Sequence, residues 1–272
     1  MSARGVRLVA LGVALLMPAC LELSAPTDGI ESISALITPF PAVVPGDTLR
    51  DSLGVARRLD LLAFTGRGDT VRNPEGLRFF VTDLESGARI EDGYLIAGDE
   101  VGAIQVVGQV PGLQTPPVTI QVTPVPVLVR AEPAGDADTV TLPAKPYGLV
   151  ASVTSDPLTV RVSGDAAGTT PVNGWIVRYR ITRQPAGITP TTLVAYLADD
   201  QGRATRGDSL AAIDTTASGV AARRVVLRPD FRANSTADVD TIIVEARVHY
   251  RGMPVAGSPV VFRVPFGPAA GQ

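Results

Sequence analysis

The sequence of 272 residues has little of what metal sites and nucleophilic catalysis require. It contains one cysteine, Cys20, and one histidine, His249. Tetrahedral zinc sites draw on several Cys and His ligands, and catalytic dyads and triads usually place a histidine beside the nucleophile. We therefore expect a protein with no enzyme activity, no cofactor and no small-molecule substrate.

Aromatic rings and surplus basic charge are also scarce. Aromatic residues make up 5% of the chain, with one Trp and five Tyr. A carbohydrate-binding surface protein would need Tyr94, Tyr147, Tyr196 or Trp175 on an open face, and it is the weakest functional alternative. With 24 basic and 27 acidic residues, the net charge of −3 lacks the basic excess that nucleic-acid binding requires. We expect no nucleic-acid partner.

No apolar run is long enough to span a bilayer as a helix, which takes about 20 residues. The run Leu8–Met17 has 10 residues, follows Arg4 and Arg7, and ends in a small residue before Cys20. A positive segment, a short apolar run and a small residue before a cleavage point are typical of an export signal. Residues 1–19 are therefore predicted to be a signal peptide.

The end of this segment, Leu16-Met17-Pro18-Ala19-Cys20, resembles the lipobox of bacterial lipoproteins. The resemblance implies that the Cys20 thiol is diacylated and that Cys20 becomes the new amino terminus, followed by a tether to residue 29. Several acyl chains anchor a protein stably to a membrane. We expect an exported protein, anchored in the cell envelope and facing the periplasm or the surface. Plain secretion with an incidental cysteine is the alternative.

Beyond Cys20 no long stretch has apolar residues at helical spacing. Val occurs 35 times, mostly in short runs bounded by turn-forming residues, and the chain has 27 Gly and 23 Pro. This pattern is typical of strands and turns. Trp175, Val177, Tyr179 and Ile181 alternate with Arg178 and Arg180, which predicts one buried and one wet face. Ile242 to Val248 and Val260 to Val264 show the same alternation.

The chain divides into two blocks of six or seven predicted strands, the number expected of a sandwich. Prolines between Pro124 and Pro146 forbid a continuous central strand there. We predict an all-β fold with two tandem sandwiches: residues 30–124 form the first, 125–147 a Pro-rich linker or the first strand of the second, 148–266 the second, and 267–272 a tail. The Pro-rich connection predicts a semi-rigid, extended pair.

Several segments resemble bacterial immunoglobulin-like domains, including invasin-type repeats. In the first block these are Thr38-Pro39-Phe40-Pro41, Val44–Thr48, Leu59–Phe64 and Gly98–Val106; in the second they are Leu158–Val162, Thr170–Val177, Asp214–Ala221, Val244–Ala246 and Gly257–Phe262. The resemblance implies immunoglobulin-like sandwiches, with Trp175 as the equivalent of the core Trp of such folds. The inter-sheet disulfide of antibody domains is absent, so packing alone must hold the sheets.

Other motifs have simpler explanations. Gly207-Asp208-Ser209-Leu210 matches a hydrolase signature, but no Asp-x-x-His partner exists, and a hairpin turn is expected there. The two Arg-Gly-Asp triplets, at residues 67–69 and 206–208, are attributed to turn chemistry. Asp136 and Asp138 are the calcium candidates, since cadherin-like modules bind calcium between domains, although turn chemistry explains them equally well.

These observations favour a non-catalytic, lipid-anchored envelope protein that acts as a structural or protein-interaction module, with a protein partner in the envelope. The alternative from another class is an accessory subunit of a larger respiratory, photosynthetic or transport complex. Such a subunit would present a contiguous apolar patch or a long unpaired edge strand, whereas a free spacer would have blunted, charged edges. Arg178, Arg180 and Arg183 cluster beside two long loops, and an ordinary wet strand face is the favoured explanation for them.

The lipobox resemblance predicts the mass of the amino-terminal peptide. After extraction from membranes, this peptide should begin at Cys20 and carry two or three acyl chains, because cleavage follows modification of the thiol. Mass spectrometry of the peptide measures this directly. A peptide that retains residues 1–19, or a free Cys20 thiol in a soluble chain, would contradict the prediction.

Overall fold

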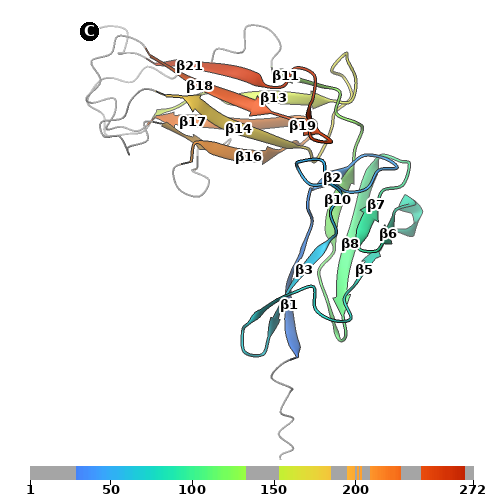
Figure 1. Ribbon diagram of the computed structural model, residues 1–272. Coiled ribbons are helices and arrows are strands. Elements are labelled where there is room, and N and C mark those ends of the chain that lie inside the picture. Colours follow the sequence, from blue (N-terminus) through green and yellow to red (C-terminus); the bar gives the residue numbers. More distant parts are fainter. Residues whose placement is uncertain are drawn as a thin grey trace, which may run out of the picture.

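The computed structural model describes residues 29–132, 153–184, 195–199, 201, 203, 209–227 and 240–266. These residues form strands and turns, with a single short 3-10 helix, η1 (Leu84–Ser86). None of the helices in this part of the chain is long and apolar enough to cross a membrane. Figure 1 shows two sandwiches that meet end to end, with their strands running in different directions.

The first unit packs two sheets face to face. Antiparallel β1 and β3 are joined by β4, and the facing sheet has the order β2-β10-β8-β5, with β9 beside β8 and a β6-β7 hairpin at the side. Between β1 and β2, Pro39 and Pro41 end the first strand, so that β2 continues in the other sheet, parallel to β10. The strands are β1 (Ile30–Ile37), β2 (Ala42–Val43), β3 (Asp60–Thr65), β4 (Thr70–Arg72), β5 (Arg78–Val81), β6 (Arg89–Glu91), β7 (Tyr94–Ile96), β8 (Gly102–Val110), β9 (Leu113–Gln114) and β10 (Val118–Val122).

The second unit has the strand order of an immunoglobulin-like sandwich. One sheet is β11-β13-β17-β12, with β15 beside β17, and the other is β16-β14-β18-β21. The sheet that contains β11, β13 and β17 thus faces the sheet that contains β14, β18 and β21, which is the arrangement of an immunoglobulin-like sandwich. The strands are β11 (Leu128–Ala131), β12 (Val153–Thr154), β13 (Leu158–Ser163), β14 (Ile176–Arg183), β15 (Ala195–Ala198), β16 (Ala211–Thr215), β17 (Val220–Leu227), β18 (Asp240–Arg247), β19 (His249–Tyr250), β20 (Met253–Pro254) and β21 (Val260–Phe266). The all-β prediction is confirmed.

The predicted alternation is confirmed in the sheet β16-β14-β18-β21. Along β14, Val177, Tyr179 and Ile181 are buried, while Arg178 and Arg180 point outward. Along β18 and β21, the even-numbered residues from Ile242 to Ala246 and from Val260 to Val264 are buried in the same way. Period-2 burial over three strands in register gives this sheet one dry and one wet face.

Turn-rich sequence conceals some of the strands. The segment around Ser209, expected to be only a turn, is followed at once by β16, an edge strand that pairs with β14. The strand expected from the alternation of Ile242 to Val248 ends at Arg247, because the Val248 amide donates to Ser258 Oγ at 3.0 Å rather than to a neighbouring strand. β11 lies between Pro126 and Pro133, and the very short strands β2, β4, β6 and β9 have too few residues to show a period.

Tyr179 is the largest polar side chain in the dry interior of the second unit. It is 1% exposed, and its hydroxyl donates to the Ala221 carbonyl oxygen at 2.9 Å, which joins the two sheets. Burial, and then the charge of Asp214, raises the pKa of Tyr179 well above its usual value, so the phenol remains a neutral donor.

Removing this hydroxyl tests the packing of the two sheets. Tyr179→Phe leaves the Ala221 carbonyl without its donor and should lower the free energy of unfolding by about 1 to 2 kcal/mol. Tyr94→Phe, which alters a half-exposed ring, is the control and should change stability little. Denaturant unfolding measures both. Equal stability of the two variants would contradict this role of Tyr179.

Candidate interaction site

An ion-pair cluster joins the two units. Asp47, which follows β2, lies 3.0 Å from Arg50 Nη2 and 2.9 Å from Arg251 Nη2, although Arg251 belongs to the β19–β20 hairpin of the second unit. The side chain of Asp47 is only 11% exposed. Gly54 closes the contact from the other side, since a Cβ added there would lie 2.2 Å from the Arg251 carbonyl carbon. The charges therefore meet in a partly dry junction.

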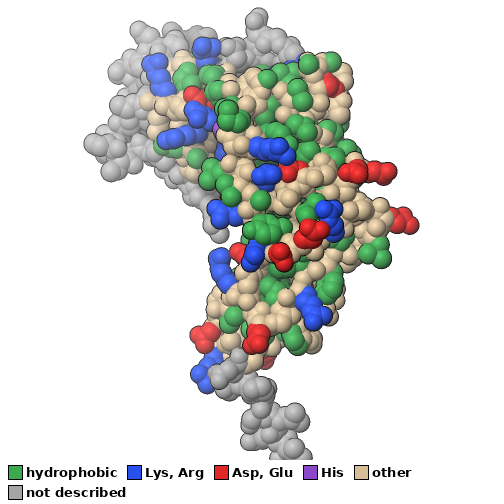
Figure 2. Space-filling model, turned by 45° about the vertical axis from the view of Figure 1, so that its right-hand side comes forward, with side chains coloured by type: hydrophobic (Ala, Val, Ile, Leu, Met, Phe, Trp, Pro, Cys, Tyr) green, Lys and Arg blue, Asp and Glu red, His purple; other side chains and the backbone are tan. Residues whose placement is uncertain are grey.

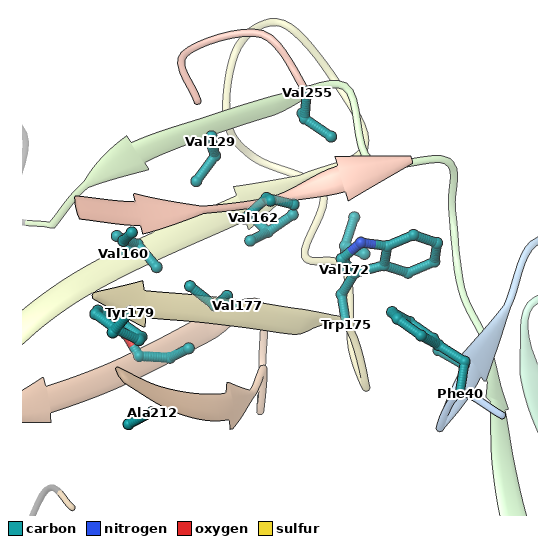
Figure 3. Close-up of a cluster of buried hydrophobic side chains, with 14 of the residues drawn as sticks. Phe40, Val129, Val160, Val162, Val172, Trp175, Val177, Tyr179, Ala212 and Val255 are labelled. Atoms are coloured by element: carbon teal, nitrogen blue, oxygen red, sulfur yellow. The ribbon is translucent and has the colours of Figure 1, made fainter. Parts of the chain in front are cut away.

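Three aromatic rings lie next to this cluster. Phe40 of the first unit packs edge-on against Trp175 with ring centroids 5.0 Å apart, and Trp175 lies 6.0 Å from Tyr250. The indole Nε1 donates to the His249 carbonyl oxygen at 3.0 Å. Trp175 was expected in the core between the sheets; it is buried, but at the end of the sandwich that meets Phe40 (Figure 3). One apolar cluster thus runs from the first unit into the second.

The junction also determines the charge of Asp47. Burial raises the pKa of Asp47, but hydrogen bonds from Arg50, Arg251 and the Thr48 amide outweigh it, so the pKa lies below its usual value. The ionised form is therefore favoured in the folded protein. Its contribution to stability is present above the ordinary carboxyl pKa and is lost as the pH falls through the lower folded value.

The outward side of β14, β16 and β18 carries a second notable group, which we call the arginine face: Arg178, Arg180, Arg247 and Ile213. Arg178 stands opposite Arg247 on one neighbouring strand and opposite Ile213 on the other. Ile213 is 52% exposed. These residues line a shallow groove of about 580 Å³ together with Ala211. Figure 2 shows blue side chains gathered on this part of the second unit.

The charges of the arginine face are poorly balanced. The only acid among its neighbours on β14, β16 and β18 that binds it is Glu245, which accepts from Arg247 at 2.6 Å. Among the described residues, neither Arg178 nor Arg180 has an ion-pair partner. Like charges directly opposite each other on neighbouring strands are destabilising. Burial, followed by the charges of Arg178 and Arg247, lowers the pKa of the nearby His249.

The site residues named from the sequence are not brought together. Cys20, Asp136 and Asp138 lie outside the described residues, as do Tyr147 and the second Arg-Gly-Asp triplet. The Ser209 hydroxyl donates to the Ala211 carbonyl oxygen and accepts from the Ala211 amide, so its hydrogen bonds are local. Arg67 to Asp69 form the exposed turn between β3 and β4. In the described segments, no three His, Cys, Asp or Glu side chains are grouped to hold a metal ion.

Neither a protein-family model nor a curated protein sequence matches the chain. Among solved structures, domains 4 and 5 of the S-layer protein SbsC match with 13% identity and a TM-score of 0.29, covering 86% of this chain and 98% of that one. The D0–D1 domains of intimin match with 14% identity and a TM-score of 0.24, covering 85% and 98%. The Escherichia coli adhesin FdeC matches with 16% identity and a TM-score of 0.25, covering 85% and 66%. At such TM-scores these superpositions do not place the chain in a family.

Sequence reasoning named Arg178 and Arg180 but not their neighbours. Arg247 and Ile213 join the arginine face only through strand register, and the contact of Asp47 with Arg251 links residues 204 positions apart. The Thr38-Pro39-Phe40-Pro41 segment could have indicated the junction, because prolines on both sides of a large apolar residue mark a fixed change of chain direction.

The junction predicts a pH effect on stability. Asp47→Asn removes the charge held by Arg50 and Arg251 and should lower the free energy of unfolding by about 1 kcal/mol at pH 7. The difference from the parent chain should shrink as the pH falls below the ordinary carboxyl pKa of about 4, and it should vanish once Asp47 is protonated at its lower folded pKa. Asp156→Asn, at an exposed position, is the control. Chemical denaturation between pH 3 and 7 measures the difference in the free energy of unfolding. A difference that is independent of pH would contradict the prediction.

Proposed function

We propose that this chain is an exported, lipid-anchored envelope protein whose immunoglobulin-like units form a non-catalytic protein-interaction module. The arginine face carries this proposal. Glu245 binds Arg247 and stands opposite Arg180, so one carboxylate serves three arginines, and the opposition of Arg178 and Arg247 weakens the sheet locally. A partner that supplies carboxylates would remove this repulsion and form charge-assisted hydrogen bonds, which are stronger than hydrogen bonds between neutral groups.

The junction supports the same proposal. Phe40, Trp175 and the pair of Asp47 with Arg251 hold the second unit on the first, so the arginine face has a fixed direction relative to the amino-terminal end. The acyl chains expected on Cys20 would place that end at a membrane. A module with a fixed orientation presents its binding face with less loss of entropy than one on a flexible tether.

Gentle detergent extraction of native membranes, followed by size separation and mass spectrometry, tests this function. Arg178→Glu/Arg180→Glu should lose the proteins, or further copies of this chain, that travel with the parent. Arg72→Glu/Arg78→Glu changes the net charge equally on the first unit and should keep them. If the parent migrates as a single chain, or if both double variants retain the same companions, the proposed role of the arginine face is wrong.

A further inference from the structure

Charge is divided unequally between the two units. Residues 29–127 contain 12 acidic and 7 basic side chains, whereas residues 128–272 contain 13 acidic and 15 basic ones. The first unit is therefore negative and the second slightly positive, although the chain as a whole is close to neutral. Such a chain carries both halves of an electrostatic contact on one molecule.

Four of the acidic side chains of the first unit lie on two loops that touch. Asp83 caps η1 and Glu85 lies in it, while Asp99 and Glu100 follow β7. A Cβ added at Gly98 would lie 2.0 Å from the Ser86 carbonyl oxygen, so the loops are in direct contact. All four acids are exposed. We call Asp83, Glu85, Asp99 and Glu100, with their apolar neighbours, the acidic tip.

The acidic tip is also unusually apolar for an exposed loop pair. Leu84 is 88% exposed and lies between Asp83 and Glu85, and Val101 is 61% exposed and follows Glu100. In the part of the chain that the structure describes, none of the four carboxylates has an ion-pair partner. Carboxylates around a protruding leucine complement the arginine face, where guanidinium groups surround the exposed Ile213.

We propose that the arginine face binds the acidic tip of a second copy of this chain. The inference rests on the proposed interaction function and names the partner. Carboxylates of Glu85 and Glu100 would come between Arg178 and Arg247 and remove their mutual repulsion, while Leu84 would cover Ile213. A second copy is the occupant we choose because the acidic tip, whose charge complements that of the arginine face, is part of this chain.

The two surfaces belong to different units of the molecule. In Figure 2 red side chains project on the right, whereas blue ones gather at the upper left. Because the contact joins two different surfaces, it is heterologous, and it generates a ring or an open row of molecules rather than a closed two-fold dimer. Anchored in one membrane plane, such chains would meet at high effective concentration, so that even a weak contact would be populated.

The test uses two neutral variants of the full chain in mild detergent. Arg178→Gln/Arg180→Gln removes the arginine face, and Glu85→Gln/Glu100→Gln removes the acidic tip. The parent should associate with increasing concentration and dissociate in high salt, because its contacts are exposed charges. Each variant alone should associate about tenfold more weakly or not at all. Their equimolar mixture should form one-to-one pairs and no longer species, since only one intact pair of surfaces remains. Analytical ultracentrifugation measures these sizes.

A photo-crosslinking residue in place of Ile213, introduced into the full chain in cells, identifies the occupant. The proposal expects a product of twice the chain mass in which residue 213 is joined to the Leu84 region. A crosslink to a different protein, or a parent chain whose association is unchanged in either variant, overturns the second-copy assignment while the interaction function stands. If position 213 captures nothing and the parent migrates as a single chain, both proposals fail.

Discussion

Strict alternation along β14 is the constraint on which the rest of the structure depends. No disulfide joins the sheets within the described residues, so the second sandwich is held by apolar side chains that must all point inward. Because side chains alternate along a strand, burial of Val177, Tyr179 and Ile181 places Arg178 and Arg180 on the outer face. A register slip of one residue would exchange the two faces completely. The core and the arginine face are therefore two consequences of a single pattern.

The junction turns two sandwiches into one oriented body. Phe40 extends the apolar interior of the first unit to Trp175 of the second, and the pair of Asp47 with Arg251 closes the same contact at its rim. Gly174 has a φ of 70° and packs against the β10 side chain of Gln121, an approach that a Cβ would obstruct. These contacts fix the direction of the arginine face relative to the amino-terminal end of the described chain.

Sequence alone predicted the regular part of this fold and little of the rest. The alternation predicted from Val260 to Val264 is confirmed in β21, where the apolar residues at even-numbered positions are buried. β16 was missed because the turn-forming residues before it dominate the local pattern, and its Ala-rich sequence has weak strand preference. Trp175 was placed correctly in the interior but not at the junction, since its contact with Phe40 depends on how two distant segments meet. Arg247 likewise joins Arg178 only through register. The predictions for Cys20, Asp136 and Asp138 stay predictions.

Arginine-selective modification of the chain in its native membranes tests the central claim most directly. A dicarbonyl reagent reacts with exposed guanidinium groups, and mass spectrometry reads the extent of reaction at each arginine. If the arginine face is occupied, Arg178 and Arg180 should react more slowly in membranes at low salt than in high salt, while Arg72 and Arg78 react alike in both. Equal and rapid reaction of all four arginines in both conditions would show that the arginine face is an ordinary wet surface.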